Sequence, residues 1–121
     1  MDEKAGFSPV SDAKARVLVL GSFPSIRSLE AGQYYAHSRN AFWKIIGSLF
    51  GAKPQTPYTE RLEILKRSGI ALWDVLGTCV RPGSMDGDID EEASRPNDFL
   101  AFFQINRAIS RICFNGQKAA G

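Results

Sequence analysis

The feature that most restricts the fold is a short apolar run near the N-terminus. Residues 16–20 read Arg-Val-Leu-Val-Leu, and Gly21 ends the run. Four successive apolar residues, two of them β-branched, give no polar face, which is typical of a strand buried on both sides. Such strands belong to parallel sheets that helices cover on both faces. The run therefore predicts an α/β fold.

Two later segments indicate further buried strands. Residues 69–76 read Gly-Ile-Ala-Leu-Trp-Asp-Val-Leu and lead into a glycine loop, and residues 111–114 read Arg-Ile-Cys-Phe. We expect residues up to about 13 to be a loose lead-in. The acidic, turn-rich segment 81–95 should be an irregular excursion.

Helical patterns lie between these strands. In residues 40–50 an amphipathic helix is predicted, ended by Gly51 and Pro54. Its inward positions should be Phe42, Ile45, Ile46 and Leu49. Thr59 can cap a second helix that buries Leu62 and Leu65, and residues 96–98 open a third that turns Leu100 and Phe103 inward. The turn at 115–116 should lead into another helix.

The order strand, helices, strand, helix, strand predicts a three-layer α/β/α arrangement with a short parallel sheet. A chain of 121 residues suits one domain, spanning residues 1–121. Because the chain ends soon after the third strand, we expect three strands, an exposed edge and an incomplete C-terminal part.

Composition excludes several classes. No apolar run reaches the roughly 20 residues of a membrane span, and the N-terminus has no apolar signal region. Cys79 and Cys113 lack metal-ligand spacing, so we expect buried free thiols and a cytoplasmic protein. The net charge of +2 is too small to indicate nucleic-acid binding. A basic region around residues 27–44, opposite the acidic segment 85–92, is compatible with a polyanion site, but scattered surface charge explains it equally well.

The loop after the first strand reads Gly21-Ser22-Phe23-Pro24-Ser25. It lacks the glycine and lysine patterns of dinucleotide and nucleoside-triphosphate loops. Its hydroxyl and N–H groups can hold one phosphate, although a plain strand-to-helix turn is an equal alternative.

The segment from Tyr34 to Trp43 mixes aromatic, amide and cationic side chains more densely than a core requires. Tyr34 and Tyr35 can stack on a base or pack as a lid. His37, the single histidine, can contact a phosphate or serve a structural role. Asn40 can cap the following helix or position a water. Asp74, at the end of the second strand, can orient water or cap a loop.

Together these segments resemble the uracil-DNA glycosylase superfamily, and most closely its hypoxanthine-DNA glycosylase branch. The matching pieces spread over residues 16–118. They are Gly-Ser-Phe-Pro-Ser, Tyr-Tyr-Ala-His-x-Arg-Asn-x-Phe-Trp, Leu-Trp-Asp-Val-Leu, Arg-x-Gly-Ser-x-Asp and Phe-Asn-Gly. The block that ends at Trp43 is the most specific of them.

The resemblance implies monofunctional hydrolysis of the N-glycosidic bond of a deaminated base, hypoxanthine or uracil, in DNA, without a metal or organic cofactor. Many superfamily members carry an Asp or Asn where this chain has Phe23, so the catalytic role passes to Asn40. We predict base binding by Phe23, Tyr35 and Asn115. The predicted contacts to DNA phosphates are Ser22, Ser25, Arg27, His37 and Arg39.

The chain departs from the pattern at two places. Ser38 replaces a proline, and nothing matches the second signature loop, which in relatives inserts into the DNA helix. Two alternatives therefore stay open: a catalytically silent homologue that binds nucleic acid, and a generic α/β interaction domain. We expect a monomer, with a swapped or edge-paired dimer as the alternative.

Overall fold

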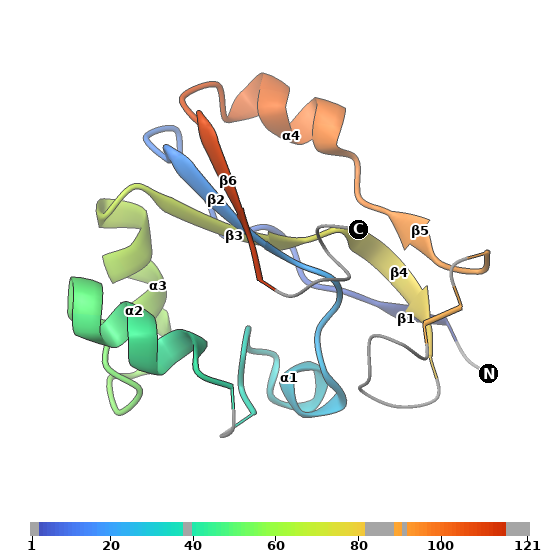
Figure 1. Ribbon diagram of the computed structural model, residues 1–121, viewed down its shortest axis with the longest axis horizontal. Coiled ribbons are helices and arrows are strands. Elements are labelled where there is room, and N and C mark those ends of the chain that lie inside the picture. The colour runs from blue at the N-terminus through green and yellow to red at the C-terminus, as the bar shows by residue number, and fades with distance from the viewer. Residues whose placement is uncertain (1–2, 38–39, 82–88, 91, 116–121) are drawn as a thin grey trace.

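A computed structural model describes all residues except 1–2, 38–39, 82–88, 91 and 116–121. Its centre is a parallel sheet of three strands in the order β3-β2-β6. The strands are β2 (Val17–Gly21), β3 (Ile70–Asp74) and β6 (Arg111–Phe114). Figure 1 shows α2 and α3 on one side of this sheet and α4 on the other. The predicted three-layer α/β/α architecture with three parallel strands is confirmed.

The register brings the carboxyl ends of the three strands to one edge of the sheet. Gly21 lies opposite Asp74, and Leu20 lies opposite Phe114. The strand β3 is buried along its whole length, as its apolar run requires. In parallel sheets this edge is where ligands bind, so it is the place to look for a site.

Two apolar clusters fill the two spaces between sheet and helices. One joins β3 to α2 (Phe42–Phe50) and α3 (Tyr58–Arg67) and contains Trp43, Leu65 and Leu72. The other joins the sheet to α4 (Phe99–Ile105) and contains Leu18, Trp73 and Phe102. Because side chains alternate along β2 and β3, both faces of the sheet contribute to the core.

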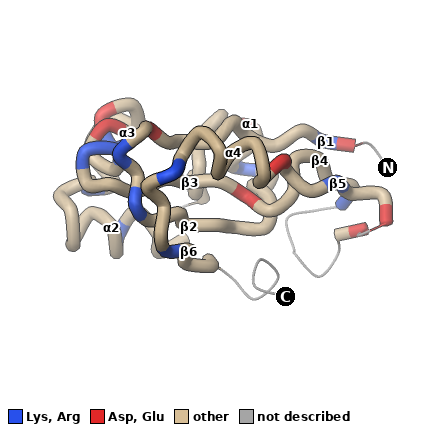
Figure 2. Tube along the Cα trace, turned by 90° about the horizontal axis from the view of Figure 1, so that it is seen from above, with Lys and Arg blue, Asp and Glu red and all other residues tan. Residues whose placement is uncertain are grey.

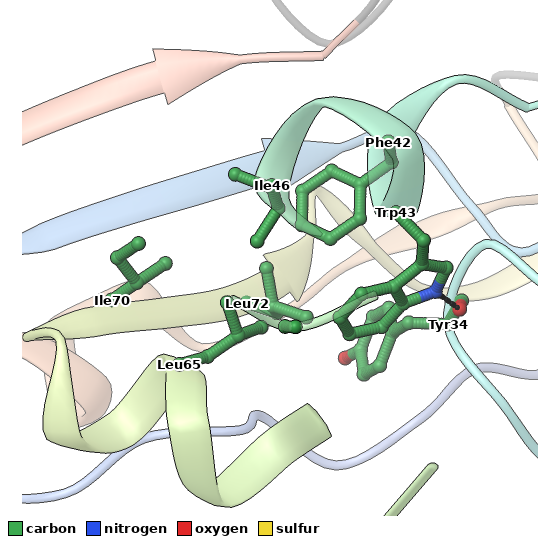
Figure 3. Packing of buried hydrophobic residues seen from close by; sticks show 8 residues of the cluster. Tyr34, Phe42, Trp43, Ile46, Leu65, Ile70 and Leu72 are labelled. Atoms are coloured by element: carbon green, nitrogen blue, oxygen red, sulfur yellow. Dashed lines mark hydrogen bonds between the residues drawn. The ribbon is translucent and has the colours of Figure 1, made fainter. Parts of the chain in front are cut away.

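Helix α2 contributes side chains to the first cluster. Figure 3 shows Phe42, Trp43 and Ile46 directed toward Leu65 and Leu72. The indole N–H of Trp43 donates to the carbonyl of Tyr34 at 2.9 Å, which ties the preceding loop to the helix. The helix ends at Gly51, whose φ of 84° is left-handed and therefore suits glycine.

A second sheet, antiparallel in the order β1-β4-β5, is absent from the sequence-based expectation. It consists of β1 (Glu3–Ala5), β4 (Leu76–Val80) and β5 (Arg95–Pro96). Of the irregular excursion expected over 81–95, Arg95 joins β5, whereas residues 82–88 and 91 lie outside the described residues. The expected loose lead-in was wrong, because residues 3–5 form β1. So was the single strand over 69–76, because the chain leaves the parallel sheet after Asp74 and pairs with the N-terminus instead. This pairing joins residues more than 70 positions apart, which no local pattern can reveal.

Several helix details also differ from the prediction. Thr59 lies inside α3, which begins after Pro57. In α2 the buried positions are Phe42, Trp43, Ile46 and Gly47, whereas Ile45 and Leu49 are exposed by 56% and 68%. The helix is rotated so that Trp43 can reach the Tyr34 carbonyl.

Two further burial expectations were wrong. Leu100 is 74% exposed, because α4 turns Phe102 inward instead. Cys113 is exposed on β6, which is an edge strand of the parallel sheet among the described residues, whereas Cys79 is buried as expected. The helix expected after residue 116 lies outside the described residues. The short helix α1 (Ile26–Ala31) follows the first loop. Among the residues described, no helix has the length and apolar character needed to cross a membrane.

Candidate functional site

The ends of β2 and β3 form a tight junction around Gly21. A Cβ atom at this position would lie 2.6 Å from Oδ1 of Asp74 and 3.2 Å from the hydroxyl oxygen of Tyr35. Both polar groups therefore lie over the glycine backbone, close to each other. Asp74 is buried, with 4% of its surface exposed. The absence of a side chain at residue 21 is what allows this arrangement.

Tyr35 is held in an unusual conformation beside this junction. Its φ of 55° places a non-glycine residue in the left-handed region, which costs about 1–2 kcal/mol and occurs often at functional sites. Its ring stacks on Phe42 with centroids 4.2 Å apart. Burial raises the pKa of the phenol, and the Asp74 carboxylate raises it further. The hydroxyl therefore stays protonated at neutral pH and can donate a hydrogen bond.

Asn115 completes the group at the end of β6. Its backbone N–H donates to the carbonyl of Leu20 at 2.8 Å, which fixes it next to β2. Its side chain lies close enough to the Tyr35 hydroxyl to lower the pKa of that group, but the pair falls short of hydrogen-bonding geometry. The structure thus brings two of the predicted base-binding residues, Tyr35 and Asn115, together.

Asn40 lies at the start of α2, where its side chain is exposed. Its Oδ1 accepts the backbone N–H of Phe42 at 2.8 Å, so Asn40 bonds to the first residue of the helix although the N-cap position itself is Ala41. An amide oxygen has a second lone pair and the NH₂ group has two donors, which leaves capacity for a water. Phe42 connects the two candidate residues, since it stacks on Tyr35 and bonds to Asn40.

Tyr34, by contrast, belongs to the core. It is 3% exposed, and its hydroxyl donates to the carbonyl of Ser8 at 3.0 Å. Burial raises the pKa of this phenol well above its ordinary value. Of the two roles considered for Tyr34, the structure gives the packing one.

The first loop is more buried than its sequence indicated. Ser22 is 7% exposed, and the Ser25 hydroxyl caps α1 by accepting the N–H of Ser28 at 3.1 Å. Phe23 packs with Cys79 and Ile89 in a third apolar cluster. Phe23 therefore anchors the first loop to this cluster.

The buried Arg81 holds the same loop in place. Its Nη2 donates to the carbonyl of Pro24 at 2.6 Å, and its guanidinium lies 5.5 Å from the centroid of the Phe23 ring. Arg81 extends from the end of β4, so the antiparallel sheet anchors the loop that follows β2.

The remaining predicted phosphate contacts are spread over the loop region. Arg27 is exposed on α1, and the His37 carbonyl accepts the N–H of Asn40 at 2.9 Å. Arg39 lies outside the described residues. Within the part of the chain that is described, no cluster of three or more His, Cys, Asp or Glu residues could hold a metal ion.

Sequence reasoning left the role of Asp74 open, between orienting water and capping a loop, and did not include Asp74 or Arg81 among the predicted site residues. For Asp74 the sequence signal was a carboxylate directly after the four apolar residues 70–73, and the structure adds that it pairs in register with Gly21. For Arg81 the sequence shows only a cation next to a predicted strand. Its partner, the Pro24 carbonyl, is 57 residues away in the sequence.

An apolar groove adjoins the site on the side of α2. It has a volume of about 390 Å³ and extends from Asn115 and Phe42 along the surface between α2 and β6. Its walls include Ile45, Phe50 and Phe114, which are exposed by 42–56%.

Comparison with known proteins is consistent across sequence and structure. The family model described as the uracil DNA glycosylase superfamily matches residues 8–121. A protein from Methanosarcina acetivorans named hypoxanthine DNA glycosylase is 39% identical over 96% of this chain and 73% of its own length. One of the same name from Methanosarcina barkeri is 39% identical over 97% of this chain and 73% of its own. A solution NMR structure from Methanosarcina acetivorans, provisionally described as a uracil DNA glycosylase, is 36% identical with a TM-score of 0.84. The similarity covers 98% of this chain and 73% of that one.

Proposed function

This chain belongs to the uracil-DNA glycosylase superfamily, and we propose from this that it is a DNA repair enzyme that removes deaminated bases. The reaction is hydrolysis of the bond between base and sugar, which releases the free base and leaves an abasic site. The observation that carries the proposal is the close similarity, over nearly the whole chain, to two proteins named hypoxanthine DNA glycosylase. Hypoxanthine is accordingly the base we propose as preferred, with uracil as the second substrate.

The substrate base must leave the DNA duplex to reach the strand ends. Extrusion costs a few kcal/mol of stacking and pairing, and an aromatic platform in the protein recovers about 1–3 kcal/mol of that. Tyr35 is the proposed platform, because its ring is partly exposed and Phe42 supports it from one face. Asn115 lies at the same edge and offers amide groups to the edge of the base.

Asn40 is the proposed catalytic residue. An amide is a poor base, so its contribution is to hold the attacking water near the sugar carbon as the glycosidic bond breaks. The bond from the Phe42 N–H fixes Oδ1 and restricts the side chain to one orientation. This hydrogen bond supports the proposed role, because a fixed amide positions water better than a free one.

The departing base gains negative charge in the transition state. Peptide N–H groups of Ser22, Phe23 and Ser25 are the donors that the first loop can offer, since Pro24 has none. Arg81 holds this loop through the Pro24 carbonyl. DNA phosphates next to the lesion are assigned to Arg27, His37 and Arg39. With Ser22 buried and Ser25 engaged in the cap of α1, their backbone groups serve better than their hydroxyls.

The enzyme acts on duplex DNA as a monomer in the cytoplasm under this proposal. The edge of β6 is unpaired among the described residues, so an edge-paired dimer is the alternative. Size-exclusion chromatography with light scattering separates the two states.

The test is an excision assay on 30-base-pair duplexes that carry one deoxyinosine or one deoxyuridine. Abasic sites are revealed by alkaline cleavage. Asn40→Ala should lower the single-turnover rate by about a hundredfold, while Asn40→Asp, which keeps an oxygen for Phe42, retains the fold as a control. Wild-type binding to DNA without excision would favour the catalytically silent homologue. An excision rate unchanged in Asn40→Ala would remove Asn40 from the mechanism.

A further inference from the structure

A group of cationic side chains lies away from the strand tips, at the opposite end of the parallel sheet. We call this group the basic end; it consists of Lys14, Arg16, Lys66, Arg67, Arg107 and Arg111. Figure 2 shows blue segments gathered where α3 ends, where α4 meets β6 and where β6 begins.

Backbone contacts establish that these residues are neighbours although they are far apart in sequence. The N–H of Arg16 donates to the carbonyl of Gly69 at 2.8 Å, and the N–H of Arg111 donates to the carbonyl of Arg16 at 3.3 Å. Gly69 follows Arg67 by two residues, and a Cβ at Gly69 would lie 3.9 Å from the Lys14 carbonyl oxygen. The amino ends of β2, β3 and β6 therefore bring the cations together.

The positive charge at the basic end is little compensated. Lys66 pairs with Glu63 at 3.5 Å. The other five side chains are exposed and form no ion pair with any residue that the structure describes. Asp12 is the other nearby acid, and its carboxylate accepts the N–H of Lys14. The six cations together with the two acids, Glu63 and Asp12, have a formal charge of +4. The whole chain has a net charge of +2.

Uncompensated like charges repel one another and lower the stability of the fold, so their concentration at one end requires a reason. Arg107 is also oriented, because its Nε donates to the Gln104 carbonyl at 3.1 Å. A guanidinium held in one orientation is suited to an oxygen-rich anion such as a phosphate diester.

We propose that the basic end is a second DNA-binding surface, which holds the phosphate backbone of a duplex segment away from the flipped base. The proposal rests on DNA being the substrate of this chain. Five residues of strand separate the basic end from the strand tips, a distance of about 15 Å. The surface thus contacts phosphates beyond those next to the lesion, and it contributes affinity that does not depend on sequence.

The test compares two variants with the same loss of charge. Arg67→Gln/Arg111→Gln removes two cations from the basic end, and Lys4→Gln/Arg95→Gln removes two from the antiparallel sheet. Affinity for an undamaged 40-base-pair duplex is measured by fluorescence anisotropy between 50 and 200 mM KCl. The basic-end variant should bind at least about fivefold more weakly at 50 mM, with the slope of log K against log salt reduced by about 1–2. The control variant should retain the wild-type slope.

Excision is then measured under single-turnover conditions at saturating enzyme, on an 11-base-pair and a 40-base-pair duplex that carry deoxyinosine. The basic-end variant should match wild type on both once DNA is saturated. Equal losses of affinity in the two variants would reduce the effect to net charge and overturn the proposal. Binding to vesicles with anionic lipid is measured for the same variants. If the basic-end variant binds DNA like wild type but binds these vesicles more weakly, the proposal is also overturned. If the wild-type protein excises no base while the basic-end variant still loses affinity selectively, the proposed activity is refuted and the proposed surface stands.

Discussion

The replacement Gly21→Ala tests the junction at the strand tips most directly. The new methyl group would lie 2.6 Å from Oδ1 of Asp74 and 3.2 Å from the Tyr35 hydroxyl oxygen. Ordinary carbon–oxygen contacts begin near 3.4 Å, so the carboxylate must move by about 0.8 Å. Because Asp74 is 4% exposed, the displaced carboxylate must press on the groups that enclose it. Overpacking of this kind costs about 1–3 kcal/mol.

Stability and activity should both respond. For a domain of this size 1 kcal/mol corresponds to roughly 3–5 °C in Tm, so we expect a loss of about 3–15 °C by differential scanning fluorimetry. Displacement of Tyr35 should also lower the single-turnover rate on deoxyinosine by about ten- to a hundredfold, measured below the melting transition.

Gly47→Ala is the matched control. Its methyl group would lie 2.8 Å from the Ala52 carbonyl oxygen and 2.9 Å from the Lys53 Cα, so it should destabilise the fold to a similar extent. This contact lies between the end of α2 and the following loop, away from the strand tips, so activity per folded molecule should persist. Equal activity in Gly21→Ala and wild type would refute the assignment of the site to this junction.

Two further predictions concern stability. Tyr34 has an ordinary pKa of 10.0 when unfolded, and burial raises it in the fold. The unfolded state therefore loses this proton first, and the contribution is present below pH 10 and decreases above it by about 1.4 kcal/mol per pH unit. Tyr34→Phe should be less stable than wild type at pH 8, because the bond to the Ser8 carbonyl is lost, and the difference should shrink above pH 10 in urea unfolding experiments. A difference independent of pH would contradict this. Asp98 caps α4 by accepting the N–H of Ala101 at 3.0 Å, so Asp98→Ala should cost about 1 kcal/mol while Asp98→Asn costs little. Urea midpoints with unchanged excision would check it, and equal effects of the two variants would exclude the cap as the cause.

Local patterns were informative where one short segment carries the physical cause. The apolar run before Gly21 predicted a buried parallel strand, and Pro96-Asn97-Asp98 predicted the start of a helix that indeed follows Asp98. Patterns failed where a partner distant in sequence decides. Ile45 and Leu49 fit a helical stripe but are exposed, because contacts of Trp43 set the rotation of α2.

The candidate site divides in the same way. Residue types and spacing singled out Tyr35 and Asn40, and similarity to known glycosylases supports the family that they indicated. The role of Asp74 stayed open and Arg81 was left out, since their positions beside Gly21 and Pro24 arise from strand register and from a second sheet.

The sequence by itself determined the α/β class, the parallel strands and the family, because hydrophobic periodicity and contiguous motifs act within a few residues. Only the tertiary structure decided which polar groups meet. Parallel register places Asp74 over Gly21, stacking on Phe42 holds Tyr35 beside them, and the amino ends of three strands collect the cations of the basic end. Such encounters depend on how separate segments pack in three dimensions, which a linear pattern does not encode.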